Sequence, residues 1–116
     1  MMNYSYCVPI LPSGEALMRK WIQDEIVESA DHDRVFRQAG IQAEQVWIQR
    51  TPMGDMAVVT FGTDDPDRAF RTLSTSTDPW AIKFRNFLTK AHGVDFSKPM
   101  PLNEMVVDWC VFEKAM

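Results

Sequence analysis

The sequence has few cysteines and no long apolar run. Cys7 and Cys110 lie near opposite ends of the chain, and no Cys-x-x-Cys pair occurs. This excludes a disulfide-rich scaffold and argues against a zinc site, so we expect two free, partly buried thiols. No apolar run approaches the ~18 residues of a membrane span, and the first residues lack the basic and apolar regions of a secretory signal. We therefore expect a cytoplasmic protein without a membrane partner.

Clusters of positive charge and glycine-rich motifs are also missing. Twelve Lys and Arg residues are scattered among sixteen Asp and Glu residues, for a net charge of -4, which makes nucleic acid an improbable partner. The five glycines are isolated, so the chain has no phosphate-binding loop, and it has no Gly-x-Ser-x-Gly element. We expect neither nucleotide binding nor serine hydrolysis, and no metal or other cofactor.

The length and composition are those of one small globular domain. A chain of 116 residues can bury one compact core, and a hydrophobic fraction of 46% is enough to form it. We therefore expect a single domain over residues 1–116.

The first half of the chain predicts a strand, a long helical stretch and a hairpin. Residues 4–11 are rich in aromatic and β-branched types, and Ser13 is a suitable N-cap for a helix. Apolar residues then recur at helical spacing over residues 15–39, with a break at 28–33 that indicates a kink or a second short helix. Strands are predicted at 46–48 and 56–61, joined by a turn rich in Pro and Gly.

The second half predicts two helix starts and a last strand. Asp65-Pro66 and Asp78-Pro79 each place a capping carboxylate before a proline at the first helical position. The second of these helices ends at Gly93, a residue suited to a left-handed C-terminal stop. After a loop that contains prolines, residues 105–112 form an apolar run that predicts the fourth strand.

This order, β-α-β-β-α-β, predicts an α+β fold of the ferredoxin-like type. Its antiparallel sheet has the spatial order 4-1-3-2, with the helices on one face. The third and fourth strands are apolar on both alternations, so the other sheet face also needs cover. A second copy of the sheet provides it, and we expect a homodimer.

Two segments carry a resemblance to a known family. They are residues 46–56, Val-Trp-Ile-Gln-Arg-Thr-Pro-Met-Gly-Asp-Met, and His92-Gly93-Val94-Asp95. The chain resembles the dimeric α/β-barrel superfamily, and within it a bacterial family without an assigned activity, distantly similar to antibiotic-biosynthesis-type monooxygenases. The resemblance implies a dimeric α/β barrel. It also implies cofactor-independent monooxygenase or isomerase chemistry on an aromatic or polyketide-like substrate.

The candidate ligand-binding residues are aromatic or polar side chains within the predicted elements. Trp47 and Gln49 share one side of their strand, where an amide beside an indole can orient a flat ligand. Asp108 and Trp109 belong to the apolar last strand, where Asp108 serves either a dimer contact or a ligand cavity. His92 either bonds the last carbonyls of its helix or faces a cavity as an acid or base. Aromatic residues at strand and helix spacing are, however, more typical of plain core packing.

Two further polar sites have structural explanations. His32 lies between Asp31 and Asp33, an arrangement typical of a solvated surface cluster, and consecutive helical residues point in different directions, which counts against a metal site. Arg50 either marks the end of a strand or supports the dimer.

Three functions remain open from the sequence. The first is a homodimer that binds a small organic molecule between sheet and helices. The second is the cofactor-independent enzyme that the resemblance implies, and the third is a non-catalytic interaction module. A cavity lined by polar groups favours the first two, and a solid core favours the third.

Overall fold

The computed structural model describes residues 2–111, which form an α+β domain of three strands and four helices. Along the chain these are β1 (Asn3–Pro9), α1 (Gly14–Glu25), α2 (Ala30–Gln38), β2 (Ala43–Gln49), β3 (Met56–Gly62), α3 (Pro66–Thr75) and α4 (Pro79–His92). The long helical stretch predicted before the hairpin is thus two helices, separated at the break seen in the sequence.

The helix ends follow from local sequence. The Asp65 side chain accepts a hydrogen bond from the Arg68 N–H at 3.0 Å, and Asp78 accepts one from Trp80 N–H at 2.9 Å. A proline occupies the first turn of each of these helices, as predicted. Gly93 ends α4 in the left-handed region, with φ of 70°.

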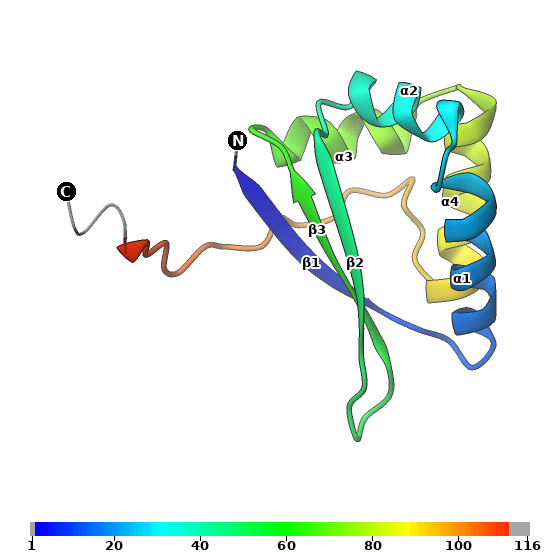
Figure 1. The fold of residues 1–116 in the computed structure, drawn as a ribbon, viewed down its shortest axis with the longest axis horizontal. Helices are drawn as coiled ribbons and strands as arrows, with labels where there is room; N and C mark the ends of the chain where they lie inside the picture. Colours follow the sequence, from blue (N-terminus) through cyan, green and yellow to red (C-terminus); the bar gives the residue numbers. More distant parts are fainter. Residues whose placement is uncertain (1, 112–116) are drawn as a thin grey trace.

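The three strands form an antiparallel sheet in the order β1-β3-β2, and the helices lie on one face of it (Figure 1). This is the 1-3-2 part of the predicted order. Side chains alternate between an inner face toward the helices and an outer face, as the burial of Ala57, Val59 and Phe61 on β3 shows.

The main core packs the inner face of the sheet against all four helices, and aromatic rings dominate it. Phe36 and Phe61 meet edge to face at 5.6 Å between ring centroids, and Trp80 stacks on Phe84 at 5.4 Å. The other buried members are Trp21, Val35, Ala39, Ile41, Val59, Ala69, Phe70, Leu73, Ala81, Leu88 and Phe96.

The predicted fourth strand is not formed by the described residues. Residues 105–110 belong to no strand, and Val106 and Val107 are 88% and 75% exposed. Asn103 is held at β1, where its backbone N–H donates to Tyr4 Oη at 2.8 Å and its side chain to Ser5 O at 2.7 Å. Beyond this point the chain leaves the body of the domain (Figure 1). Phe112, the predicted end of the strand, lies outside the described residues.

Both cysteines are free thiols, but they are not packed as expected. Cys7 is exposed on the outer face of the sheet, and Cys110 is half-buried. The expectation of two partly buried thiols therefore holds for one of them. Within residues 2–111, none of the helices has the length and apolar character needed to cross a membrane.

Gly14, the first residue of α1, is expected to tolerate no side chain. A Cβ at this position would lie against the carbonyl oxygen of Ala91 in α4, which also accepts a hydrogen bond from Leu11 N–H at 2.9 Å. Gly14→Ala should therefore lower the free energy of unfolding by about 2 kcal/mol, the usual cost of forcing an atom into a packed site. The measurement is urea denaturation.

The matched control is Ser13→Ala. Ser13 is the N-cap of α1, yet its side chain makes no capping hydrogen bond, so this substitution should change stability by less than about 0.5 kcal/mol. Equal losses in the two variants would contradict the proposed clash.

Candidate functional site

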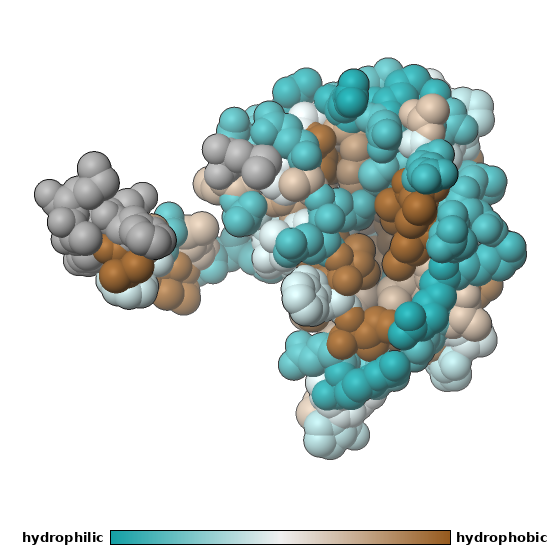
Figure 2. Space-filling view, viewed as in Figure 1, coloured by the Kyte–Doolittle hydropathy of each residue, from teal (hydrophilic) through white to brown (hydrophobic). Residues whose placement is uncertain are grey.

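A small apolar cavity lies between the inner face of the sheet and helices α1 and α4. Its volume is about 40 Å³, room for very few water molecules. Figure 2 shows hydrophobic side chains on both sides of the recess between α1 and the sheet. The lining residues are Tyr6, Val8, Met18, Trp21, Ile22, Ile26, Glu44, Val46, Ala57, Val59, Phe84, Phe87, Leu88 and His92.

The cavity continues outward into a wider hollow between α1 and the edge strand β2. This mouth has a volume of about 270 Å³ and shares Met18, Ile22 and Val46 with the cavity. Arg19, Trp47 and Ile48 complete its lining. Together the cavity and its mouth, named here the α1–β2 cleft, reach the ~300 Å³ at the lower end of small-molecule pockets.

His92 supplies a hydrogen-bond acceptor to the cavity. Its Nδ1 lies 2.8 Å from the carbonyl oxygen of Pro9, which requires the proton on Nδ1 and leaves a lone pair on Nε2. The residue is only 4% exposed, and this burial lowers the pKa of His92 despite the bond to Pro9. The ring is thus neutral near pH 7. Its partner is the end of β1, not the last carbonyls of its own helix.

Two further residues that line the cavity, Trp21 and Tyr6, carry donor groups. The indole Nε1 of Trp21 is buried and has no hydrogen-bond partner among the described residues, which leaves a polar group unsatisfied next to a cavity. Burial raises the pKa of Tyr6, and the nearby Glu44 carboxylate raises it further, so its hydroxyl stays protonated. The Trp80 Nε1 is also unpartnered, but Trp80 does not line the cavity.

Glu44 joins the cavity to a histidine on α2. Glu44 Oε1 lies 3.0 Å from His32 Nε2, and Asp33 Oδ1 lies 3.1 Å from His32 Nδ1. The His32 side chain is only 12% exposed. Burial lowers the pKa of His32, but the hydrogen bonds to Glu44 and Asp33 outweigh it, and the net change is upward. His32 is therefore part of a half-buried contact between α2 and β2, not of the solvated cluster expected from the sequence.

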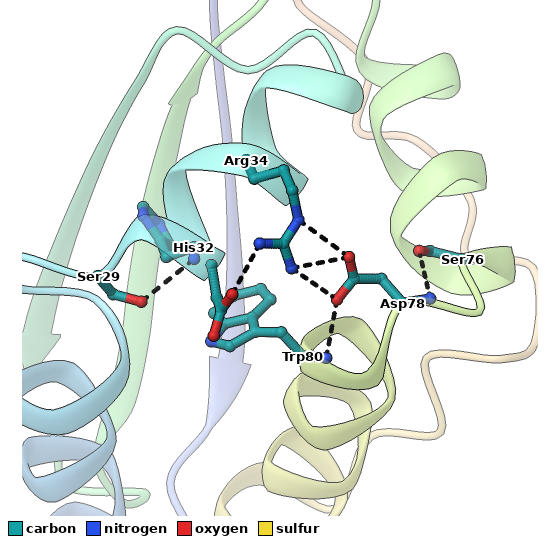
Figure 3. Close-up of polar contacts among 7 residues, drawn as sticks. Ser29, His32, Arg34, Ser76, Asp78 and Trp80 are labelled. Atoms are coloured by element: carbon teal, nitrogen blue, oxygen red, sulfur yellow. Dashed lines mark hydrogen bonds and ion pairs between the residues drawn. The ribbon is translucent and has the colours of Figure 1, made fainter.

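An ion pair fixes the position of α2 relative to α4. Arg34 contacts both carboxylate oxygens of Asp78, at 2.8 to 3.1 Å, and its Nη1 contacts Asp31 at 2.7 Å (Figure 3). The same Asp78 caps α4 through Trp80 N–H. This backbone bond and the Arg34 guanidinium hold the pKa of Asp78 below its usual range. The contact holds α2, and with it His32, which bonds the cavity residue Glu44.

The structure places the candidate residues from the sequence in three regions. His92 lines the cavity, and Trp47 lies on the outer face of β2 at the lip of the cleft, 62% exposed. Gln49 is exposed on the same outer face. Asp108 and Trp109 belong to the exposed segment that leaves the domain. Ligand contacts by these five residues stay a prediction.

Other polar groups near the cleft were not anticipated. Glu44 precedes the predicted start of the second strand at Val46, and only the longer strand observed here gives it an inward position. Tyr6 and Trp21 were assigned to their elements without a polar role. Arg50 pairs with Glu15 at 2.6 Å and Asp55 at 2.7 Å, outside the cleft.

No group of three or more His, Cys, Asp or Glu side chains within the described part of the chain could hold a metal ion. Comparisons with protein-family models, curated proteins and solved structures find no match. The site is therefore interpreted from its own geometry.

The two histidines should give opposite pH dependences of stability. The folded-state pKa of His92 is lowered, so its stabilising contribution is complete above about pH 6.5 and is lost as the pH falls. The folded-state pKa of His32 is raised, so its contribution is complete below about pH 6.5 and is lost as the pH rises. Urea denaturation of His92→Gln and His32→Gln between pH 5 and 8 measures each effect as a difference from the wild type.

In these differences, the carboxylates that contact neither histidine cancel, whereas Asp33 and Glu44 belong to the His32 contact that is being measured. Relative to His92→Gln, the wild type should lose stability toward pH 5. Relative to His32→Gln, it should lose stability toward pH 8. Parallel curves for all three proteins would contradict both assignments.

Proposed function

We propose that the protein binds a small, flat organic molecule in the α1–β2 cleft. The observation that carries this proposal is the buried, unsatisfied N–H of Trp21, a residue that lines the same apolar cavity as the neutral His92. A buried donor without a partner costs about 1–3 kcal/mol, and a ligand that accepts its hydrogen bond recovers that energy. The solid core expected of a pure interaction module would not contain such a space.

The polar groups define the class of ligand. An oxygen atom can accept from Trp21 Nε1, and a hydroxyl or amide N–H can donate to His92 Nε2. The Glu44 carboxylate disfavours an anionic group at the inner end, and the apolar lining favours an aromatic or alicyclic body. A neutral ring compound with one hydroxyl group fits these requirements. Because the inner cavity is small, the ring occupies the mouth and directs its hydroxyl inward.

The test uses 1-naphthol as the probe and isothermal titration calorimetry as the measurement. Trp21→Phe keeps an aromatic ring and removes the N–H, and should weaken binding about tenfold, the equivalent of one hydrogen bond. Trp80→Phe removes the other unpartnered indole N–H, which does not line the cavity, and should leave the affinity unchanged. Naphthalene, without the hydroxyl, should show no difference between wild type and Trp21→Phe.

Equal effects of Trp21→Phe and Trp80→Phe would place the probe elsewhere. Failure of 1-naphthol to bind at millimolar concentration would contradict the assignment of the ligand class.

A catalytic role, which the resemblance implies, is the second candidate. The supporting observation is that His92 is held neutral, with Nε2 as the one ring nitrogen free to take a proton. A bound hydroquinone that loses a proton to Nε2 becomes easier to oxidise, and transfer of two electrons and two protons to oxygen gives a quinone and hydrogen peroxide. No cofactor is required for this step.

An oxygen electrode measures this activity with naphthalene-1,4-diol. The wild type should exceed the spontaneous rate of oxygen uptake, and His92→Gln should lose at least about tenfold, the lower range of proton-transfer catalysis. Uptake at the spontaneous rate in the wild type would leave binding as the function.

We also propose that the protein acts as a homodimer through the outer face of the sheet. The register aligns Cys7, Val58 and Trp47 in one row across the three strands, with Pro9, Met56 and Gln49 in the next. Apart from Gln49 this half of the outer face is apolar, and its β1 and β2 residues are exposed. A second copy that buries it forms the barrel expected from the sequence.

A further inference from the structure

The segment 104–111, named here the arm, has the composition of a strand but no strand partner. Its hydrophobic residues Met105, Val106, Val107, Trp109 and Val111 are all at least 51% exposed. β-branched and aromatic residues at this density are typical of strands. An exposed apolar segment of this kind marks an interaction site.

The two edges of the sheet differ in their capacity to accept a strand. At the β1 edge, Pro9 lacks an N–H and its carbonyl is bound by His92, while Asn103 occupies the carbonyl of Ser5. At the β2 edge, the facing residues follow from the register. The bonds from Thr63 N–H to Met2 O and from Ile10 N–H to Asp55 O show that the odd-numbered residues of β3 face β1, so its even-numbered residues face β2. Their partners on β2 are odd-numbered, which leaves the N–H and C=O groups of Glu44, Val46 and Ile48 facing outward, where no described residue bonds them.

The arm cannot reach this edge effectively within its own chain. Asn103 anchors it beside β1, and a place beyond β2 is four strand spacings away, ~19 Å. The eight residues of the arm span at most ~28 Å, so only two or three would remain to pair. In a second copy whose sheet packs on the outer face about a two-fold axis parallel to the strands, the partner's β2 lies opposite β1 at ~10 Å. About five residues of the arm then remain to pair.

We infer that the arm of each chain pairs with the free edge of β2 in a second copy, reciprocally. The inference rests on the proposed homodimer and adds to it a specific exchange of segments. It gives the predicted fourth strand a place beside the partner's β2, in contrast to the order 4-1-3-2, where it lies beside its own β1. Because Val46, Trp47 and Ile48 line the mouth of the α1–β2 cleft, the partner's arm also borders the ligand site.

Cross-linking tests which chain the arm contacts. In a Cys7→Ser background, a cysteine replaces Ala43, Gln45 or Gln49 in turn, and Cys110 remains as the reporter on the arm. Treatment with a short bis-maleimide should give a covalent dimer on a denaturing gel for at least one position. Adding Cys110→Ser should abolish that band. A linked monomer, a band that survives Cys110→Ser, or no link at any position would overturn the inference.

Proline tests the strand pairing itself. Val107→Pro should raise the dissociation constant of the dimer about 100-fold, because proline removes a ladder donor and distorts the strand. Val107→Thr keeps strand propensity and should change it less than about tenfold. The arm makes no strand contact in the isolated chain, so both variants should keep the wild-type circular dichroism and melting temperature of the monomer.

Sedimentation velocity distinguishes a wrong assignment of the arm's partner from a wrong assignment of the dimer. A monomeric wild type would overturn both proposals. If Trp47→Glu on the outer face dissociates the dimer while Val107→Pro leaves it intact, the dimer stands and the exchange of arms is wrong.

Discussion

The attachment of the end of α4 to the end of β1 determines the arrangement of the domain. His92 Nδ1 donates to Pro9 O, Leu11 N–H donates to Ala91 O, and Gly14 lets the backbone of α1 approach the same carbonyl. These contacts join α1 and α4 to the sheet at one end. The cleft occupies the space between α1 and β2. The bond that orients the helix layer is also the bond that fixes the tautomer of the cavity histidine.

The polar groups in the cavity are few, and each is constrained by its surroundings. His92 is neutral because it is buried, and Tyr6 is kept protonated by burial and by Glu44. Glu44 in turn is held by His32, which α2 positions through the Arg34–Asp78 ion pair. Under the proposed function, a ligand in the cleft meets polar groups whose protonation and contacts are set before it binds. Such preorganisation lowers the entropic cost of binding.

Much of the fold was predictable because its signals are local. The Asp-Pro pairs at 65–66 and 78–79 specify helix starts through a capping bond and a fixed φ, and the hairpin depends on a short turn. The fourth strand was not predictable in this way. An apolar run over residues 105–112 indicates strand propensity but does not specify the partner, which depends on the anchor at Asn103.

The candidate site was less predictable than the fold. His92 was identified by residue type, but its contact with Pro9 joins positions far apart in the sequence. Glu44 was missed because the predicted strand began at Val46. A strand that begins earlier places the Glu44 side chain on the same inner face as Val46, two residues further along. The unsatisfied N–H of Trp21 depends on packing between α1 and the sheet, and no sequence pattern reports that.

The open edge of β2 has a consequence for how the chain behaves before assembly. Its seven residues contain no proline and no lysine, two of the features with which proteins protect exposed sheet edges. A chain with a free edge and a free apolar segment can add to another chain without limit, which leads to aggregates, whereas reciprocal pairing of two chains closes the assembly. The yield of refolded protein should then rise with protein concentration while it is low, because closure needs two chains. At higher concentration the yield should fall, because open-ended addition competes with closure. If the proposed exchange of arms occurs, the solubility of the chain depends on how quickly two chains pair.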